Sequence, residues 1–145
     1  MLADYHTHTP LCRHAEGEPE EYLDKALAAG LVEYGISDHA PQTPEPFDDW
    51  RMLESELPEY LEWIERVRQH AGDQLSVRAG LECDWFSDCH EWIVNLSSRY
   101  EWDFLIGSVH YLGDKWDFDN PKWLGRWAET DVEEIWKAYW EEYAS

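Results

Sequence analysis

Three histidines lie close together near the start of the chain, in the stretch DYHTHTPLCRHAEG. His6 and His8 are separated by one residue, and His14 follows in the same stretch. On an extended strand, residues i and i+2 point to the same side, so both rings of an H-x-H pair can reach one cation. His14 can return to that place only through a loop, for which Pro10 and Gly17 supply the bends. Because imidazole is a ligand of zinc, manganese and iron, this stretch predicts part of a metal site.

Further candidate ligands lie where predicted strands end. Asp38 and His39 occur in GISDHAP, Glu82 in GLECDW, and His110 in GSVHYL. A single residue of this kind is usually structural. Four successive strand ends that all carry imidazole or carboxylate instead favour a shared, multinuclear metal site.

The elements that would position these residues alternate between strand and helix. Strands are expected at Ala3–His6, Leu31–Ser37, Leu75–Cys83 and Asp103–Leu112. Amphipathic helices are expected in the stretches 18–30, 57–72, 92–96 and 130–143. Strand–helix repeats imply parallel strands with right-handed crossovers, and chemistry in such folds gathers at the carboxyl ends of the strands. The fourth strand, DFLIGSVHYL, is mostly apolar, which is typical of a strand buried on both faces.

Several residues predict where the helices begin and end. Pro19 stands at the expected start of the first helix, and Gly30 and Gly72 follow the first and second helices as stop signals. Thr130, with Glu133 three residues later, has the spacing of a capping box at the start of the last helix.

The composition indicates one acidic domain of 145 residues. Asp and Glu number 32 against 11 Lys and Arg, for a formal net charge of −21, which disfavours nucleic acid and anionic membranes as partners. The three cysteines form no C-x-x-C pair, which fits a reducing compartment. No apolar run approaches the ~20 residues of a membrane span, and the start lacks the features of a signal peptide. We therefore expect a cytoplasmic protein.

Taken in order, DYHTHTPLCRHAEG, GISDHAP, GLECDW and DFLIGSVHYL resemble the motifs of the polymerase-and-histidinol-phosphatase (PHP) superfamily. Among its branches, the chain most resembles the monofunctional histidinol-phosphatases of histidine biosynthesis. The resemblance implies an α/β fold, a distorted seven-stranded, TIM-like β/α barrel, of which residues 1–145 would form the N-terminal half with about four parallel βα units. It also implies hydrolysis of a small-molecule phosphomonoester with up to three divalent metal ions, zinc, manganese or iron.

The resemblance further implies a set of metal ligands, all imidazoles or carboxylates near strand ends: His6, His8, His14, His39, Glu82 and His110. The first metal would take His6, His8 and Glu82. The second would take His14 and His39. The third would take His110 together with Glu82, which would bridge two of the ions.

Catalytic and substrate-binding roles also follow from the resemblance. Glu82, Asp38 and His39 would belong to the catalytic machinery, and Asp38 could act by orienting neighbouring ligands. Arg13 would contact the substrate phosphate.

The chain departs from the family in length, because relatives continue with further strands that carry a ligand histidine and an Asp-x-His motif. Each metal would thus lack one protein ligand, and the open barrel edge would favour a homo-oligomer or a complementing C-terminal half. Our leading hypothesis is hydrolysis of L-histidinol phosphate. The alternatives are an inactive metal-binding half-domain that needs a partner, and a PHP phosphoesterase with another phosphorylated substrate.

Overall fold

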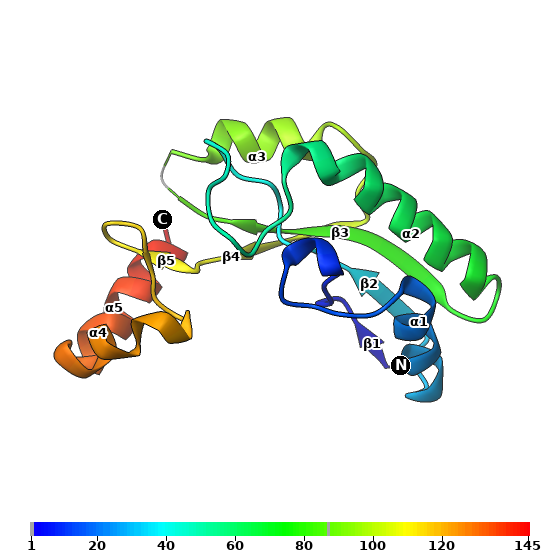
Figure 1. The fold of residues 1–145 in the computed structure, drawn as a ribbon, viewed down its shortest axis with the longest axis horizontal. Coiled ribbons are helices and arrows are strands. Elements are labelled where there is room, and N and C mark those ends of the chain that lie inside the picture. The colour runs from blue at the N-terminus through cyan, green and yellow to red at the C-terminus, as the bar shows by residue number, and fades with distance from the viewer. Residues whose placement is uncertain (1, 87) are drawn as a thin grey trace.

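Four parallel strands form a curled half-barrel in the computed structural model, which describes residues 2–86 and 88–145 (Figure 1). The strands lie side by side in chain order, so the predicted sequential, parallel arrangement is confirmed. Their bounds are β1 Ala3–Asp4, β2 Glu33–Ile36, β3 Ser76–Asp84 and β4 Phe104–Ser108.

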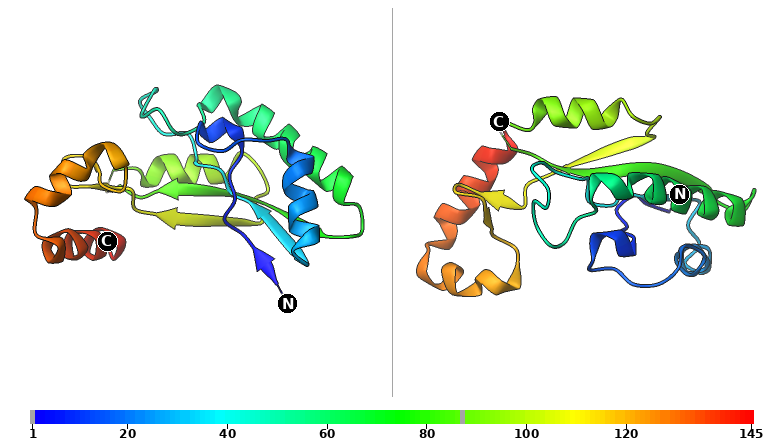
Figure 2. Two further views of the ribbon diagram at one scale, coloured as in Figure 1. Left: turned by 60° about the horizontal axis from the view of Figure 1, so that its bottom comes forward. Right: turned by 45° about the horizontal axis from the view of Figure 1, so that its top comes forward.

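Helices connect the strands, as the sequence predicts. They are α1 Pro19–Ala28, α2 Leu57–Ala71 and α3 His90–Ser97, with short 3-10 turns η1 Pro10–Cys12 and η2 Glu54–Glu56. Helix α1 packs against α2, and α2 packs against β3 (Figures 1 and 2). No helix among the described residues combines the length and apolar character needed to span a membrane.

The ends of α1 and α2 follow from local chemistry. Pro19 is the first residue of α1, and the Glu21 carboxylate accepts a hydrogen bond of 2.8 Å from the backbone N–H of Glu18. Gly30 follows the end of α1 with a φ of 76° and Gly72 follows α2 with a φ of 51°, a region that residues with a Cβ rarely adopt. The predicted stop signals are confirmed.

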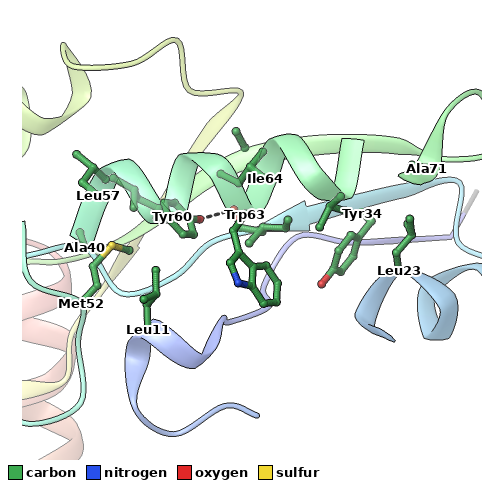
Figure 3. Close-up of a cluster of buried hydrophobic side chains, with 14 of the residues drawn as sticks. Leu11, Leu23, Tyr34, Ala40, Met52, Leu57, Tyr60, Trp63, Ile64 and Ala71 are labelled. Atoms are coloured by element: carbon green, nitrogen blue, oxygen red, sulfur yellow. Dashed lines mark hydrogen bonds between the residues drawn. The ribbon is translucent and has the colours of Figure 1, made fainter. Parts of the chain in front are cut away.

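The main core lies between α2 and the sheet and centres on Tyr60, which is fully buried (Figure 3). Ile64 and Val67 of the same helix are also fully buried in this cluster. The Tyr60 hydroxyl accepts a hydrogen bond from the Asp38 N–H at 3.1 Å and donates to the Gly80 carbonyl at 2.7 Å. Burial raises the pKa of Tyr60 well above its usual value, so the hydroxyl keeps the proton that it donates. It thus joins β3 to the residues that follow β2.

The sheet also carries aromatic rings that need glycine beneath them. The Phe104 and Tyr5 rings meet edge to face with centroids 5.3 Å apart. A Cβ at Gly80 would come within 2.4 Å of the Phe104 ring, and a Cβ at Gly35 would meet both Phe104 and Tyr5 at 2.8 Å. A larger residue at Gly80 would therefore require the Phe104 ring to move, and one at Gly35 would also require the Tyr5 backbone to move, because the Tyr5 Cα lies equally close.

The fourth strand differs from its prediction. It ends at Ser108, and Tyr111–Leu112 forms a separate strand, β5, which pairs antiparallel with β6 at Trp116–Asp117. Strand β4 is not buried on both faces, because Leu105 is 41% exposed. The physical reason is that the following segment does not return to the sheet.

That segment forms a second cluster built on the β5–β6 hairpin, and it projects away from the sheet (Figures 1 and 2). It contains η3 Pro121–Trp123, α4 Leu124–Glu129 and α5 Val132–Tyr143. Its buried side chains are Val109, Leu112, Trp116, Phe118 and Ile135. The other face of α5 leaves Trp136, Trp140 and Tyr143 exposed, as expected of an incomplete barrel, and association through it stays a prediction.

The predicted capping box at α5 is wrong by one residue. The N-cap is Asp131, whose carboxylate accepts a hydrogen bond of 2.9 Å from the Glu133 N–H. Thr130 instead ends α4, where its hydroxyl donates to the Arg126 carbonyl at 2.8 Å. Thr and Asp are both common N-cap residues, but Thr130 already belongs to the C-terminal end of α4, so Asp131 caps α5.

Candidate metal centre

Glu82 lies at the centre of the carboxyl-end rim of the sheet. It is the seventh residue of β3 and is only 2% exposed. Its backbone N–H donates to the Asp38 carbonyl at 3.0 Å, and its carbonyl accepts from the Ala40 N–H at 2.8 Å. These bonds continue the β2–β3 pairing past the end of β2, and they place His39 directly beside Glu82.

Four imidazoles surround the Glu82 carboxylate. Nε2 of His6 lies 3.0 Å from Oε2, Nε2 of His8 lies 3.4 Å from it, and Nδ1 of His39 lies 3.1 Å from it. Nε2 of His110 lies 3.5 Å from the other oxygen, Oε1. The H-x-H pair therefore directs both rings to one carboxylate.

His14 completes the group on the far side of His8 and His39. Its ring centroid lies 5.1 Å from that of His8 and 5.2 Å from that of His39. Nδ1 of His14 contacts the Cys12 carbonyl at 2.9 Å, so a proton on Nδ1 leaves Nε2 as the free ligand atom. The η1 turn returns this ring to the rim, as the loop argument predicts. Cys12 itself is buried, and its thiol donates to the Thr9 carbonyl.

Asp38 lies behind this group and is fully buried. Its carboxylate accepts hydrogen bonds from the Thr9 hydroxyl and from the His39 N–H, the latter at 3.0 Å. Oδ1 lies 3.4 Å from Nδ1 of His8, on the opposite side of that ring from Glu82. Asp38 can therefore hold the His8 ring with Nε2 facing Glu82.

The imidazoles of His8 and His39 have opposite protonation behaviour. Burial lowers the pKa of His8, but the hydrogen bond and charge of Asp38 outweigh burial and raise it to about 9. Burial and the neighbouring imidazoles push the pKa of His39 far below its usual value. His39 is thus neutral and ready to act as a ligand, whereas His8 must lose a proton first.

The arrangement fits divalent cations. Glu82 Oε2 and His39 Nδ1 are both buried, and within the described part of the chain neither has a hydrogen-bond partner. Buried polar atoms without partners are costly, and a cation between a carboxylate and an imidazole would satisfy both. Three groups of potential ligands have their donor atoms within 4.8 Å of one another: His6, His8 and Glu82; His8, Cys12 and His14; and His39, Asp84 and His110.

A cavity of about 540 Å³ opens in front of these ligands. Asp117 and Asp119 of the segment after β5, and Asp49 and Trp50 of the loop before α2, also line it. Lys122 lies 3.6 Å from Asp117. The cavity therefore combines the imidazole ligands with further carboxylates, one of which has a lysine partner.

Arg13 is not among the residues that line this cavity. Its guanidinium donates to both carboxylate oxygens of Glu56, at 2.7 and 2.5 Å, and to the Leu11 carbonyl. The structure thus brings together His6, His8, His14, His39, Glu82 and His110, with Asp38 behind them, but it does not bring Arg13 to them.

Sequence reasoning missed two buried charged residues at the site. Oδ1 of Asp84 lies 2.5 Å from Nδ1 of His110, and Oδ2 accepts a hydrogen bond of 2.8 Å from Arg51. Asp84 could have been found, because it is two residues after Glu82 on the same strand and so points to the same side. Arg51 lies in an irregular loop, where no periodicity marks it.

Comparison with known proteins identifies close relatives. The PHP domain family matches residues 4–145. The chain is 42% identical over 140 residues to a protein named as a probable histidinol-phosphatase from Deinococcus radiodurans, a match that covers 96% of this chain and 53% of the relative. It is 32% identical over 117 residues to the histidinol-phosphatase of Bacillus subtilis, covering 75% of this chain and 44% of that protein.

A solved structure has the same fold. The histidinol phosphate phosphatase of Lactococcus lactis, in complex with zinc, L-histidinol and phosphate, superposes with a TM-score of 0.67 at 28% identity. The match covers 77% of this chain and 41% of that one. The chain thus spans about half the length of the relatives it matches.

Proposed function

The chain belongs to the PHP domain family, and from that membership we propose that it forms the metal-binding N-terminal part of a cytoplasmic phosphatase that hydrolyses L-histidinol phosphate to L-histidinol and phosphate. The observation that carries the proposal is the buried, unpartnered Oε2 of Glu82, with three imidazole nitrogens within 3.4 Å. The relatives named as histidinol-phosphatases support the choice of substrate.

The proposed ligands hold up to three divalent ions, zinc, manganese or iron. His6, His8 and Glu82 hold the first, His14 and His39 the second, and Glu82 and His110 the third. When bound, such ions supply Lewis acidity toward phosphoryl oxygens and lower the pKa of water. Zinc is the metal in the Lactococcus lactis complex.

The residues of the chain have separate tasks in this scheme. Glu82 would supply a carboxylate ligand to bound cations, and Asp38 keeps the Nε2 atom of His8 directed at it. Trp50 covers His39 and His110 with ring centroids 4.5 and 5.3 Å away, so it shields that side of the site from water. His39, kept neutral by burial, offers a lone pair without first losing a proton.

The carboxylates of the cavity suit the organic part of the proposed substrate. L-Histidinol phosphate carries a primary amine close to its phosphate group. Oδ2 of Asp119 lies 3.9 Å from Nε2 of His110, and Asp117 lines the same cavity. A phosphate held at the imidazoles would leave the amine near these carboxylates, whereas an ester without a cationic group would gain nothing from them.

A second candidate function is metal binding without catalysis until a complementing C-terminal half or a second copy of the chain joins it. The observation that favours it is coverage, because the chain spans only 53% of its relative from Deinococcus radiodurans. The exposed aromatic side chains of α5 and the unpaired edge of β4 offer surfaces for such a partner.

One experiment separates these candidates. Zinc- or manganese-loaded chain is assayed for phosphate release from L-histidinol phosphate, p-nitrophenyl phosphate and a nucleoside monophosphate. Preference for histidinol phosphate, lost in Glu82→Gln and kept in Asp103→Asn, supports the phosphatase. Asp103 is a suitable control because it is a carboxylate just before β4 that pairs with Arg68 of α2 at 3.1 Å and does not line the cavity. Metal binding without hydrolysis favours the second candidate, and preference for another ester refutes the proposed substrate.

A further inference from the structure

A chain of buried charges extends outward from His110 and ends on the β5–β6 hairpin. His110 contacts Asp84, Asp84 accepts from Arg51 at 2.8 Å, and Arg51 Nε donates to Asp48 at 2.7 Å. The Tyr111 hydroxyl then donates to the same Asp48 oxygen at 2.6 Å. Asp84 and Arg51 are 2% and 4% exposed, so this network lies inside the protein behind the metal ligands.

A buried ion pair of this kind needs a reason beyond stability. Removing two charges from water is costly, and well-packed apolar residues of similar volume are often at least as stabilising. Because burying the Asp84–Arg51 ion pair is costly, we look for its role in the geometry of the neighbouring metal ligands.

The contact to His110 fixes which ring nitrogen carries the proton. Oδ2 of Asp84 accepts from Arg51, and Oδ1 lies 2.5 Å from Nδ1 of His110, so this contact favours a proton on Nδ1 that the carboxylate oxygen accepts. In the neutral ring the lone pair then lies on Nε2, which is the atom that faces Glu82 at 3.5 Å. Without Asp84 the ring would be free to place its proton on either nitrogen.

Arg51 fixes the other side of the same region. Its guanidinium lies over the Trp50 ring, 4.5 Å from the centroid, and its Nη1 donates to the Ala40 carbonyl at 3.3 Å. Ala40 directly follows His39, and Trp50 contacts the rings of both His39 and His110. One guanidinium therefore connects the Asp84 carboxylate, the backbone after His39 and the indole that covers two ligands.

We propose that Asp84 and Arg51 act together as positioning residues for the cation held by His110 and Glu82. Asp84 selects the form of His110 that has its lone pair on Nε2. Arg51 holds Asp84 in place and keeps Trp50 against the imidazoles. The inference rests on the metal centre proposed above and assigns these two residues a part in forming it.

The test combines a zinc titration with a spectroscopic measurement. Zn²⁺ binding to the full chain is followed by calorimetry in the wild type, Asp84→Asn, Arg51→Met and the control Asp103→Asn, and the His110→Asn variant identifies the site that contains His110. Asp84→Asn and Arg51→Met should weaken the His110 site by roughly 10–100-fold. They should leave the site of His6 and His8 unchanged. Asp103→Asn, which breaks carboxylate–arginine pairs to Arg68 of α2 and Arg78 of β3, should weaken no site.

The nitrogen-15 chemical shifts of His110 in the metal-free chain report its tautomer directly. The wild type should carry the proton on Nδ1, and Asp84→Asn should give a mixture or the Nε2-protonated form. If Asp84→Asn is too unstable, the double variant Asp84→Asn with Arg51→Met removes both buried charges and allows the same measurement. An unchanged tautomer, or an unchanged affinity at the His110 site, overturns the proposal.

The two proposals fail in different ways. A wild-type chain that bound no zinc would refute the metal centre, and with it the role of the pair in binding. A wild-type chain that bound zinc but hydrolysed no histidinol phosphate would refute the proposed reaction and leave the positioning role to be decided by the variants.

Discussion

Tyr60→Phe removes one oxygen atom from the most buried aromatic side chain of the core. The Asp38 N–H would then have no acceptor, and the Gly80 carbonyl would lose its 2.7 Å donor. The ring itself keeps its packing, because phenylalanine has the same shape apart from the hydroxyl. The change therefore isolates the hydrogen bonds from the apolar contacts.

The expected cost follows from burial. A buried donor left without a partner costs about 1–3 kcal/mol, and water cannot replace the hydroxyl easily because Tyr60 is fully buried. For a domain near this size, each kcal/mol lowers Tm by roughly 2–4 °C, so the variant should melt roughly 2–12 °C below the wild type. Asp38 also contacts His8, so zinc affinity should fall as well.

The assay is thermal unfolding of the metal-free chain in the presence of a chelator, followed by circular dichroism. Tyr22→Phe is the matched control, because the Tyr22 hydroxyl donates to the Glu16 carbonyl at 2.6 Å in an exposed position. Its removal should change stability by no more than about 0.5 kcal/mol. Equal Tm values for Tyr60→Phe and the wild type would refute the view that this hydroxyl joins β3 to the residues that follow β2.

Three further predictions concern the metal centre and its completion. His6→Ala should weaken the zinc site of His6, His8 and Glu82 by more than roughly 100-fold, since it removes a ligand rather than a ligand's hydrogen-bond partner. His70→Ala on α2 should have no effect in the same titration. Zinc binding below pH 9 should release a proton from His8, whose pKa is raised to about 9, so zinc affinity should rise with pH up to that value. Calorimetry in buffers of different ionisation enthalpy measures the number of protons released, and the absence of proton release at pH 7 would contradict the assignment. Adding the C-terminal half of a relative, fused or as a separate chain, should raise hydrolysis of histidinol phosphate by orders of magnitude in a phosphate-release assay, and full activity without it would disprove the need for completion.

The alternation of strands and helices could be predicted because each element carries its own periodicity. The position of the site then follows, since parallel strands place the residues at and just beyond their ends on one rim. Strand β1 ends at Asp4 and not at the predicted His6, yet the rings of His6 and His8 both reach Glu82 there. The break after Ser108 could not be predicted, because DFLIGSVHYL stays apolar through the turn from β4 to β5. Val109 and Leu112 of its second half are buried in the cluster of the β5–β6 hairpin, whereas no residue of β4 in its first half is buried, and only the tertiary structure separates the two halves.

In the network behind His110, one residue could be predicted from the sequence and the others could not. Asp84 shares a strand face with Glu82, so alternation alone marks it as a neighbour of the site. Arg51 and Trp50 reach the site from a loop with no repeating pattern, and their contacts depend on how that loop crosses the sheet. Arg13 looked available for phosphate in the sequence, yet it pairs with Glu56, a residue far along the chain.

The alternation of residues along β3 makes the register of this strand important for the site. Gly80, Glu82 and Asp84 occupy one face in turn: the glycine accommodates the Phe104 ring, the first carboxylate gathers the imidazoles, and the second orients one of them. A slip of β3 by one residue would turn all three away together and present Leu81 and Cys83 to the imidazoles instead. A single shift in the register of β3 would therefore remove three things at once: the packing of the Phe104 ring, the Glu82 ligand and the Asp84 orienting group.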